Sequence, residues 1–138
     1  MQIRELDLKE LYTVYEIVSQ LRTELSYQEF EDLIYDMRHM DYKMIGIMEQ
    51  DTIVAYAGVA VQTNLYHKRH LYVFDLVSDE KRRGQGYGKM MLEYLKDYAK
   101  IAMCENIVLS SGFAKEEAHQ FYKKNGFYKK SFVFVKTL

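Results

Sequence analysis

A glycine-rich loop between an apolar segment and an amphipathic segment most restricts how this chain can fold. Residues 71–78 read LYVFDLVS and are almost wholly apolar, whereas residues 90–102 carry apolar side chains at helical spacing. Between them, the segment 81–89 (KRRGQGYGK) holds three of the seven glycines of the chain. Glycine adopts left-handed backbone conformations easily and lets other groups approach the backbone closely. The order therefore predicts a buried strand that passes through an open backbone loop into a helix.

The start of that helix would suit an anion. A helix N-terminus leaves about four backbone amides unpaired and carries about half a positive charge. Arg82, Arg83 and Lys89 add cationic side chains beside it. These features predict a cradle for a phosphate or a diphosphate. The structural alternative is a glycine-rich turn that only connects the strand to the helix.

Two common phosphate-binding motifs do not match this loop. A Walker loop requires G-x-x-x-x-G-K-[ST], but Arg83 stands five positions before Gly88, and Met90 follows Lys89. The dinucleotide fingerprint requires G-x-G-x-x-G, whereas the glycines here are spaced G-x-G-x-G. A third pattern, R-x-x-G-x-G, is satisfied by Arg83, Gly86 and Gly88.

The rest of the chain predicts a mixed α/β sheet with helices on both faces. Period-two and apolar segments predict strands at residues 2–6, 42–49, 52–63, 71–78, 106–111 and 130–136. Helical periodicity predicts helices at residues 8–22, 27–38, 87–100 and 114–124. Capping boxes at Asp7/Glu10 and Ser26/Glu29 would begin the first two helices, and Gly126 would end the last.

Composition excludes several classes of protein. A formal net charge of −1 argues against nucleic acid as the main partner, because phosphate neutralisation requires a basic excess. No apolar run approaches the roughly 20 residues of a membrane span. The single cysteine, Cys104, cannot form an internal disulfide, so we expect a reducing, cytoplasmic location. His67 and His70 are too few for a metal site, so no metal is expected.

The loop sequence resembles the acetyl-coenzyme A (acetyl-CoA) pyrophosphate loop of the GNAT N-acetyltransferase superfamily. The resemblance continues into a distal A-x-x-x-Y-x-x-x-G-F pattern at Ala118, Tyr122, Gly126 and Phe127. It covers roughly residues 70–136 by motif, whereas residues 1–69 match only in the order of the elements. The resemblance implies a single GNAT-like domain over residues 1–138, of the α/β (α+β) class. Its sheet would be mixed, mostly antiparallel and twisted, with about six to seven strands and about four helices on both faces.

The implied function is an acetyl-CoA-dependent N-acetyltransferase that transfers the acetyl group directly to a primary amine. The acceptor would be an unidentified small molecule or peptide, placed against residues 8–22, 27–38 and 63–70. A non-catalytic acyl-CoA-binding sensor or regulatory module on the same fold is the main alternative. A binder of nucleotide phosphates is the third. The apolar segment SFVFV (131–135) could pair with another copy, which would give a homodimer.

The resemblance also implies where acetyl-CoA binds. Backbone groups of the central strand would pair with the pantetheine arm, and the loop would hold the diphosphate. The residues concerned are Leu76, Val77, Ser78, Arg83, Gly84, Gln85, Gly86, Tyr87, Gly88, Lys89 and Lys115. Two of them depart from the family pattern: Ser78 stands where valine is more common, and Lys115 where an asparagine often contacts pantetheine.

Two side chains are candidates for the proton transfers. Tyr122 lines up with the family's general-acid tyrosine, which protonates the leaving thiolate; alternatively, it only packs, as most of the 13 tyrosines must. A lysine-like amine is deprotonated only about once in 10³ molecules at pH 7, so a proton acceptor is needed. Asp75 is the only acid within the apolar run 71–78 and must have a partner or a shifted pKa. It could receive the amine proton or serve as a buried structural partner.

Overall fold

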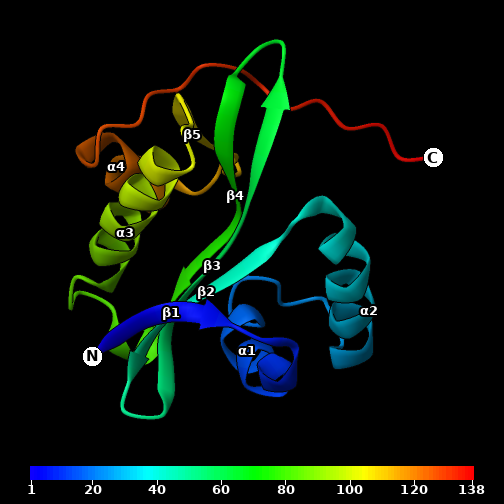
Figure 1. Ribbon diagram of the computed structural model, residues 1–138, viewed down its shortest axis with the longest axis vertical. Coiled ribbons are helices and arrows are strands. Elements are labelled where there is room, and N and C mark those ends of the chain that lie inside the picture. Colours follow the sequence, from blue (N-terminus) through cyan, green and yellow to red (C-terminus); the bar gives the residue numbers. More distant parts are fainter. The chain divides into compact units, whose positions relative to one another are not determined.

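The computed structural model describes all 138 residues, which divide into two compact units, residues 1–108 and 109–138 (Figure 1). The strands are β1 (Gln2–Leu6), β2 (Lys43–Glu49), β3 (Thr52–Asn64), β4 (Lys68–Ser78) and β5 (Asn106–Leu109). The α-helices are α1 (Leu11–Val18), α2 (Tyr27–Met37), α3 (Tyr87–Ile101) and α4 (Glu116–Lys124). Short 3-10 turns occupy η1 (Leu8–Glu10), η2 (Arg38–Met40) and η3 (Glu80–Arg82).

The strands form one sheet in the order β1-β2-β3-β4-β5, and the first four pair antiparallel with their neighbours. The predicted class is confirmed, but the sheet has five strands instead of six to seven. The strand predicted at residues 130–136 is wrong, because this segment has no regular structure. Its run of aromatic and β-branched side chains suits a strand, yet a strand forms only where a neighbour completes its hydrogen bonds. Phe132 and Phe134 are instead 71% and 93% exposed.

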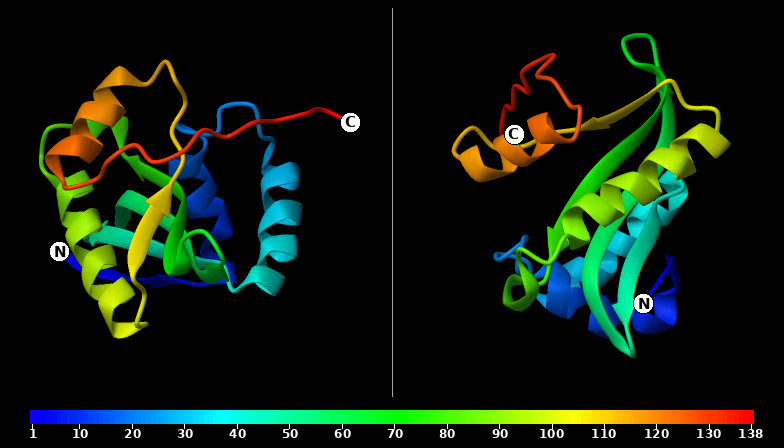
Figure 2. Two further views of the ribbon diagram at one scale, coloured as in Figure 1. Left: turned by 90° about the horizontal axis from the view of Figure 1, so that it is seen from above. Right: turned by 90° about the vertical axis from the view of Figure 1, so that its left-hand side faces the viewer.

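Helices of the first unit cover both faces of the sheet, as predicted (Figure 2). On one face, α1 and α2 bury apolar side chains against residues of β2, β3 and β4. On the other face lies α3, which buries Met91, Leu92, Leu95 and Ala99. The strands between these layers are nearly continuous in apolar side chains; residues 53–60 of β3 are all buried. This two-sided burial holds β4 and the loop after it in a fixed frame.

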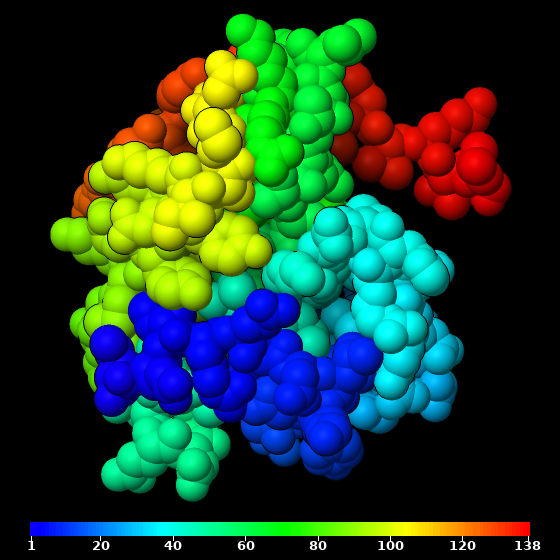
Figure 3. Space-filling model, in the orientation of Figure 1, coloured from blue at the N-terminus to red at the C-terminus, as the bar shows by residue number.

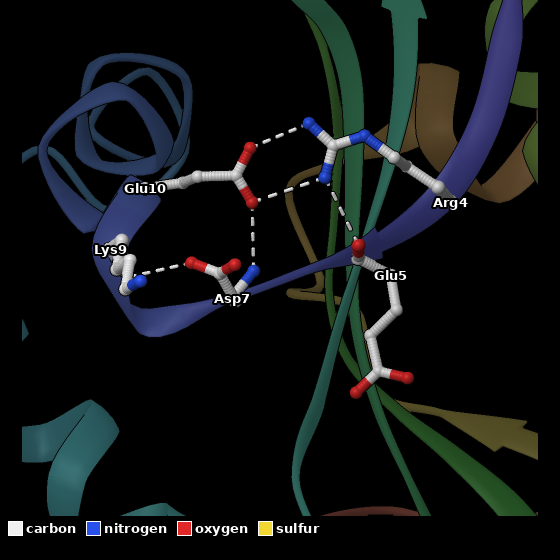
Figure 4. A network of polar contacts seen from close by, with 5 residues as sticks. All are labelled: Arg4, Glu5, Asp7, Lys9 and Glu10. Atoms are coloured by element: carbon white, nitrogen blue, oxygen red, sulfur yellow. Dashed lines mark hydrogen bonds and ion pairs between the residues drawn. The ribbon is translucent and has the colours of Figure 1, made fainter.

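Both predicted capping boxes are present. Asp7 accepts a hydrogen bond from the Lys9 amide at 2.8 Å, and Glu10 accepts one from the Asp7 amide at 2.8 Å (Figure 4). Arg4 donates to the same Glu10 carboxylate at 2.6 Å, and this hydrogen bond lowers the pKa of Glu10. The box begins η1, and α1 follows and ends at Val18, four residues before the predicted end. Ser26 caps α2 in the same manner.

Strands β3 and β4 form a long hairpin, and its tip projects from the rest of the first unit (Figure 3). Its pairing continues to Asn64 opposite Lys68, at the tip. Leu65 in the turn is fully exposed. A side chain substituted at position 65 would therefore contact few other residues.

In the second unit, α4 is followed by residues without regular structure. The predicted stop of α4 is confirmed: Gly126 has a φ of 88°, a left-handed conformation that suits glycine. The amide of Gly126 donates to the Lys123 carbonyl at 3.2 Å, and the amide of Phe127 donates to the Tyr122 carbonyl at 3.0 Å. These bonds close the helix end and fix the chain direction just after Tyr122.

Candidate active site

A β-bulge interrupts β4 in its second half. Gly58 lies opposite Asp75 while Val59 lies opposite Val73, so Phe74 is an extra residue on β4. A bulge bends its strand and leaves a backbone group outside the ladder, and such features are common beside active sites. Here the Phe74 carbonyl accepts a hydrogen bond from Arg22 Nη2 at 2.8 Å.

The acid that follows the bulge is held by side chains from three other segments. Asp75 Oδ1 accepts from Arg22 Nε at 2.9 Å, and its Oδ2 accepts from the Tyr42 hydroxyl at 2.7 Å. The hydroxyls of Tyr42 and Tyr56 are 2.8 Å apart. Since Tyr42 has one proton and gives it to Asp75, Tyr56 donates to Tyr42. The partners predicted for Asp75 are therefore present, and its role in proton transfer stays a prediction.

Burial controls the two phenols of this network. It raises the pKa of Tyr42 and of Tyr56 well above the usual value, and the nearby Asp75 charge adds to the effect. Both phenols therefore stay protonated at neutral pH and act as hydrogen-bond donors. Gly58 makes room for them, because a Cβ at this position would overlap the Tyr42 hydroxyl.

A cavity of about 220 Å³ adjoins the Arg22–Asp75 pair. Its lining comes from α1 and the turn after it, from α2, and from the bulge of β4. The lining residues are Val18, Arg22, Leu25, Phe30, Leu33, Ile34, Met37, Tyr42, Phe74 and Asp75. This is the region expected for the acceptor. Polar or amphipathic side chains in or near the ranges expected to face the acceptor include Arg22, Tyr27, Tyr35, Arg38 and His67. Of these, only Arg22 lines the cavity.

A larger cavity, of about 320 Å³, lies among residues 5–8, Arg38 and residues 41–44. It shares Tyr42 with the smaller cavity. No residue of β4 or of the glycine loop lines it. Of the two cavities, only the smaller one adjoins β4.

The glycine loop presents an open backbone. Gly84 and Gly86 have φ values of 81° and 84°, and no atom lies within 4 Å of where a Cβ would stand on either. Gly86 begins α3, and no side chain caps this end of the helix. The amides of Tyr87, Gly88 and Lys89 in the first turn have no partner within the helix. The loop can therefore hold an anion by its backbone.

The cations around the loop divide into two kinds. Arg82 donates to Asp79 Oδ2 at 2.5 Å, and Gln20 Nε2 donates to Asp79 Oδ1 at 3.3 Å. Burial alone would raise the pKa of Asp79, but hydrogen bonds from the Lys81 amide, Gln20 and Arg82 outweigh it and lower the pKa. Arg82 thus fixes the loop entrance, so the predicted rim of three cations retains two exposed ones, Arg83 and Lys89.

Sequence reasoning missed Gln20 and Asp79 as supports of this loop. Gln20 also accepts a hydrogen bond from the Glu80 amide at 2.9 Å, which joins the segment after α1 to the residues after β4. An acid directly after an apolar strand was the available signal for Asp79. Nothing local marks Gln20, because its partners lie about 60 residues away.

The side chains of Tyr87 and Gln85, two other residues of the loop, differ in exposure. The Tyr87 hydroxyl donates to Glu49 Oε1 at 3.2 Å. The pKa of Tyr87 is raised mainly by burial and further by this hydrogen bond. Its side chain is therefore tied to the end of β2, and only its backbone amide faces the loop. Gln85 is exposed.

The last residues of β4 lie beyond the reach of β5. The Glu105 amide donates to the Arg69 carbonyl at 2.7 Å, so β5 meets β4 near the start of β4. Since β5 has four residues, it cannot extend from Arg69 as far as Leu76. Residues 76–78 pair with β3 on one side, and their other side is free of β5. This is the edge expected to receive the pantetheine arm.

Tyr122 and Lys115 belong to the second unit. The Tyr122 ring lies 5.6 Å from Phe121 and 5.7 Å from Phe127, measured between centroids. Burial raises the pKa of its phenol, and the hydroxyl makes no hydrogen bond within the chain. The residue packs by its ring and keeps a proton available at its tip. Lys115 directly precedes α4.

His119 is a third side chain that sequence reasoning missed. Its Nε2 lies 2.8 Å from the Gly112 carbonyl, and its Nδ1 is buried without a hydrogen-bond partner. A buried polar atom without a partner is uncommon in folded proteins. The spacing of three residues from Tyr122 within α4 was the available signal.

Two further classes of site are not seen. No group of three or more His, Cys, Asp or Glu side chains is arranged to hold a metal ion. No helix is both long enough and apolar enough to cross a membrane.

The sheet with its bulged β4, and the open loop that leads into α3, define the fold of the GNAT acetyltransferases. A model of the Acetyltransferase (GNAT) family matches residues 6–127, and the chain belongs to this family. It is an N-acetyltransferase, of the acyltransferase class EC 2.3.1.

Two relatives agree in activity class. The chain is 35% identical to the uncharacterized N-acetyltransferase YhdJ of Bacillus subtilis (strain 168), over 90% of this chain and 89% of that one. It is 26% identical to an aminoalkylphosphonate N-acetyltransferase of Salmonella typhimurium (strain LT2), over 99% and 91% of the two chains.

A solved structure shows the same fold. It is an aminoglycoside N-acetyltransferase in complex with CoA, with a TM-score of 0.86 and 10% identity over 99% of this chain and 93% of that one.

Proposed function

We propose that this protein transfers the acetyl group of acetyl-CoA to the primary amine of a small molecule. The proposal rests on the start of α3. This helix end has no side-chain cap, and it follows a loop with two glycines in the left-handed conformation. Hydrogen bonds to a charged group contribute about 1.5–3 kcal/mol each, so four amides supply about 6–12 kcal/mol before costs. A micromolar dissociation constant corresponds to a binding free energy of about 8 kcal/mol. The loss of translational and rotational freedom on association costs several kcal/mol more. The loop therefore needs help from the pantetheine arm.

We assign that help to the end of β4. Backbone groups of Leu76, Val77 and Ser78 on the side free of β5 would pair with the amides of the arm, as an added strand does. In the loop, the amides of Gly84, Gln85, Gly86, Tyr87, Gly88 and Lys89 would surround the diphosphate. Arg83 and Lys89 would add charge at the rim. Lys115, in place of the usual asparagine, would contact a phosphate.

Bound acetyl-CoA supplies an acyl carbon activated by a thioester. In the transfer, a bond forms between that carbon and the amine nitrogen, and the carbon–sulfur bond breaks. The phenol of Tyr122 would give its proton to the leaving thiolate, a role that suits a group kept protonated by burial. Asp75 would take the proton lost by the amine, directly or through water. A backbone amide at residues 76–78 would stabilise the negative oxygen.

The experiment combines binding with thiol release. Acetyl-CoA should raise the melting temperature more than ATP does, and a panel of primary amines should release free thiol. Tyr122→Phe should lower kcat about 100-fold and keep the affinity for acetyl-CoA. Tyr128→Phe, which changes a phenol that is 74% exposed, is the control.

Three outcomes would contradict the proposal. Stronger protection by ATP would favour the nucleotide-phosphate binder. Tight binding of acetyl-CoA without thiol release from any amine would favour the sensor. An unchanged kcat in Tyr122→Phe would remove its role as the general acid.

We also propose that residues 131–135 add a strand to a second copy of the chain. Their apolar side chains are exposed, although aromatic and β-branched residues suit a strand; Val133 and Val135 are 63% and 85% exposed. Pairing with another sheet would bury them. Phe134→Asp should convert a dimer to a monomer in sedimentation equilibrium, and a wild-type monomer at micromolar concentration would contradict the proposal.

A further inference from the structure

The cavity beside β4 has a predominantly apolar wall. Side chains of α2 provide most of it, through Phe30, Leu33, Ile34 and Met37. Val18, Leu25 and Phe74 complete the apolar part. Burial of a ligand's apolar surface against such a wall is favourable by about 25 cal/mol for each Å² of that surface removed from water. A strongly hydrated substrate body would lose its water here without compensation.

The size of the cavity limits the acceptor further. Its volume of about 220 Å³ lies below the roughly 300–1,000 Å³ of pockets that hold drug-sized ligands. Most of an aminoglycoside or of a folded peptide segment would lie outside it. A compact amine with a short branched or aromatic body would fill it.

The polar end of the cavity accommodates a neutral amine. Arg22 and Tyr42 use one position on each oxygen of Asp75, and an ionised carboxylate can accept about four hydrogen bonds. Asp75 can therefore accept a further bond from an amine. Because Arg22 balances the charge of Asp75, this end attracts an ammonium less than a lone carboxylate would. The neutral amine is also the nucleophilic form.

The same end is poorly suited to a phosphonate. Arg22 is the only cationic side chain in the lining, and its Nε and Nη2 already bind Asp75 and the Phe74 carbonyl. The neighbouring Asp75 would also repel an anion. The acceptor class of the Salmonella relative therefore does not match this cavity.

We infer that the acceptor is a small monoamine with an apolar body, bound with its nitrogen at the Arg22–Asp75 pair and its body against α2. This inference rests on the proposed transfer reaction. Leu33 is the residue to test, because it is 46% exposed and tolerates a polar substitution at the helix surface. Leu33→Glu would place a carboxylate where the apolar body lies.

The experiment measures kcat/KM with acetyl-CoA for 2-phenylethylamine, 3-methylbutylamine, ethylamine, 2-aminoethylphosphonate and spermidine. The two larger apolar amines should exceed ethylamine by at least about tenfold, since one methylene in an apolar pocket changes rates by about 10-fold or more. Leu33→Glu should lower kcat/KM for 2-phenylethylamine about tenfold and lower it for ethylamine by a smaller factor, so that the preference for the larger amine decreases. Leu65→Glu, at the fully exposed hairpin tip, is the matched control and should keep the wild-type order.

Calorimetry separates this inference from the proposed function. Titrations of acetyl-CoA and of 2-phenylethylamine report binding without turnover. Acetyl-CoA binding together with preference for the phosphonate or spermidine overturns the inference and leaves the transferase proposal intact. An unchanged preference in Leu33→Glu, or no binding of 2-phenylethylamine, also overturns it. Failure to bind acetyl-CoA would overturn the proposed function itself.

Discussion

The glycine loop and the network around Asp75 differ in how their polar groups are satisfied. In the loop, the amides at the start of α3 have no partner and two glycines leave the space above them empty. In the network, Arg22, Tyr42, Tyr56 and Asp75 bind one another through bonds of 2.7–2.9 Å. The loop is open to a ligand that completes it, whereas the network is already bonded internally and keeps only further acceptor positions on Asp75.

Glycine has opposite purposes in the two regions. Gly58 is required because the Tyr42 hydroxyl occupies the place of its side chain. Gly86 has free space around it and is required for its left-handed backbone and, as proposed, for the approach of the diphosphate. A substitution at Gly58 should therefore change stability, and one at Gly86 should change binding.

The largest effect is expected for Gly58→Ala. The new methyl group would displace Tyr42 and break its bonds to Asp75 and Tyr56, so we expect a loss of about 3 kcal/mol in the free energy of unfolding. Urea denaturation measures it. Gly112→Ala is the control, because its Cβ would meet Lys115 Cγ at an ordinary 3.9 Å. Equal stability of the two variants would show that the network does not depend on Gly58.

A smaller effect, on affinity, is expected for Gly86→Ala. Alanine in the left-handed region costs about 1–2 kcal/mol, and the methyl group would stand where the diphosphate approaches. We expect acetyl-CoA to bind at least about tenfold more weakly, which is about 1.4 kcal/mol, in isothermal titration. Gly126→Ala carries the same strain at a φ of 88° outside the loop and should keep most of the affinity. If both variants bind acetyl-CoA as the wild type does, the loop is not the anchor.

The smallest effect should appear in the alkaline pH dependence of stability. The pKa values of Tyr42 and Tyr56 are raised in the folded state, whereas an unfolded tyrosine titrates near pH 10. Stability from these phenols is complete below pH 10 and decreases above it, because the unfolded chain then loses protons that the folded chain keeps. The slope is at most about 1.4 kcal/mol per pH unit for each phenol.

Tyr56→Phe should remove one phenol's share of this slope. Urea denaturation at several pH values between 9 and 11 measures it, and Tyr12→Phe, at a position 67% exposed, controls for the loss of a phenol. An identical slope in wild type and Tyr56→Phe would contradict the assignment.

Local patterns predicted most of the secondary structure. The capping boxes, the strands predicted at residues 42–49 and 52–63, and the stop at Gly126 each depend on residues within a few positions, and all are confirmed. The strand predicted at residues 130–136 is wrong because aromatic and β-branched side chains indicate only a preference for a strand, whereas a strand also needs a partner. The end of α1 at Val18 was likewise not marked by any local stop signal.

The sequence by itself determined the class of protein and the open loop, because a glycine pattern and the following helix act through adjacent backbone. Only the tertiary structure decided the surroundings of Asp75. Residues 22, 42, 56 and 75 come from four segments, and the bulge at Phe74 lies directly before Asp75. The different roles of Arg82 and Arg83 also depend on the tertiary structure. Asp79, which Gln20 supports, binds Arg82, whereas Arg83 is exposed to solvent. Contacts between distant segments depend on packing, and no spacing along the chain encodes them.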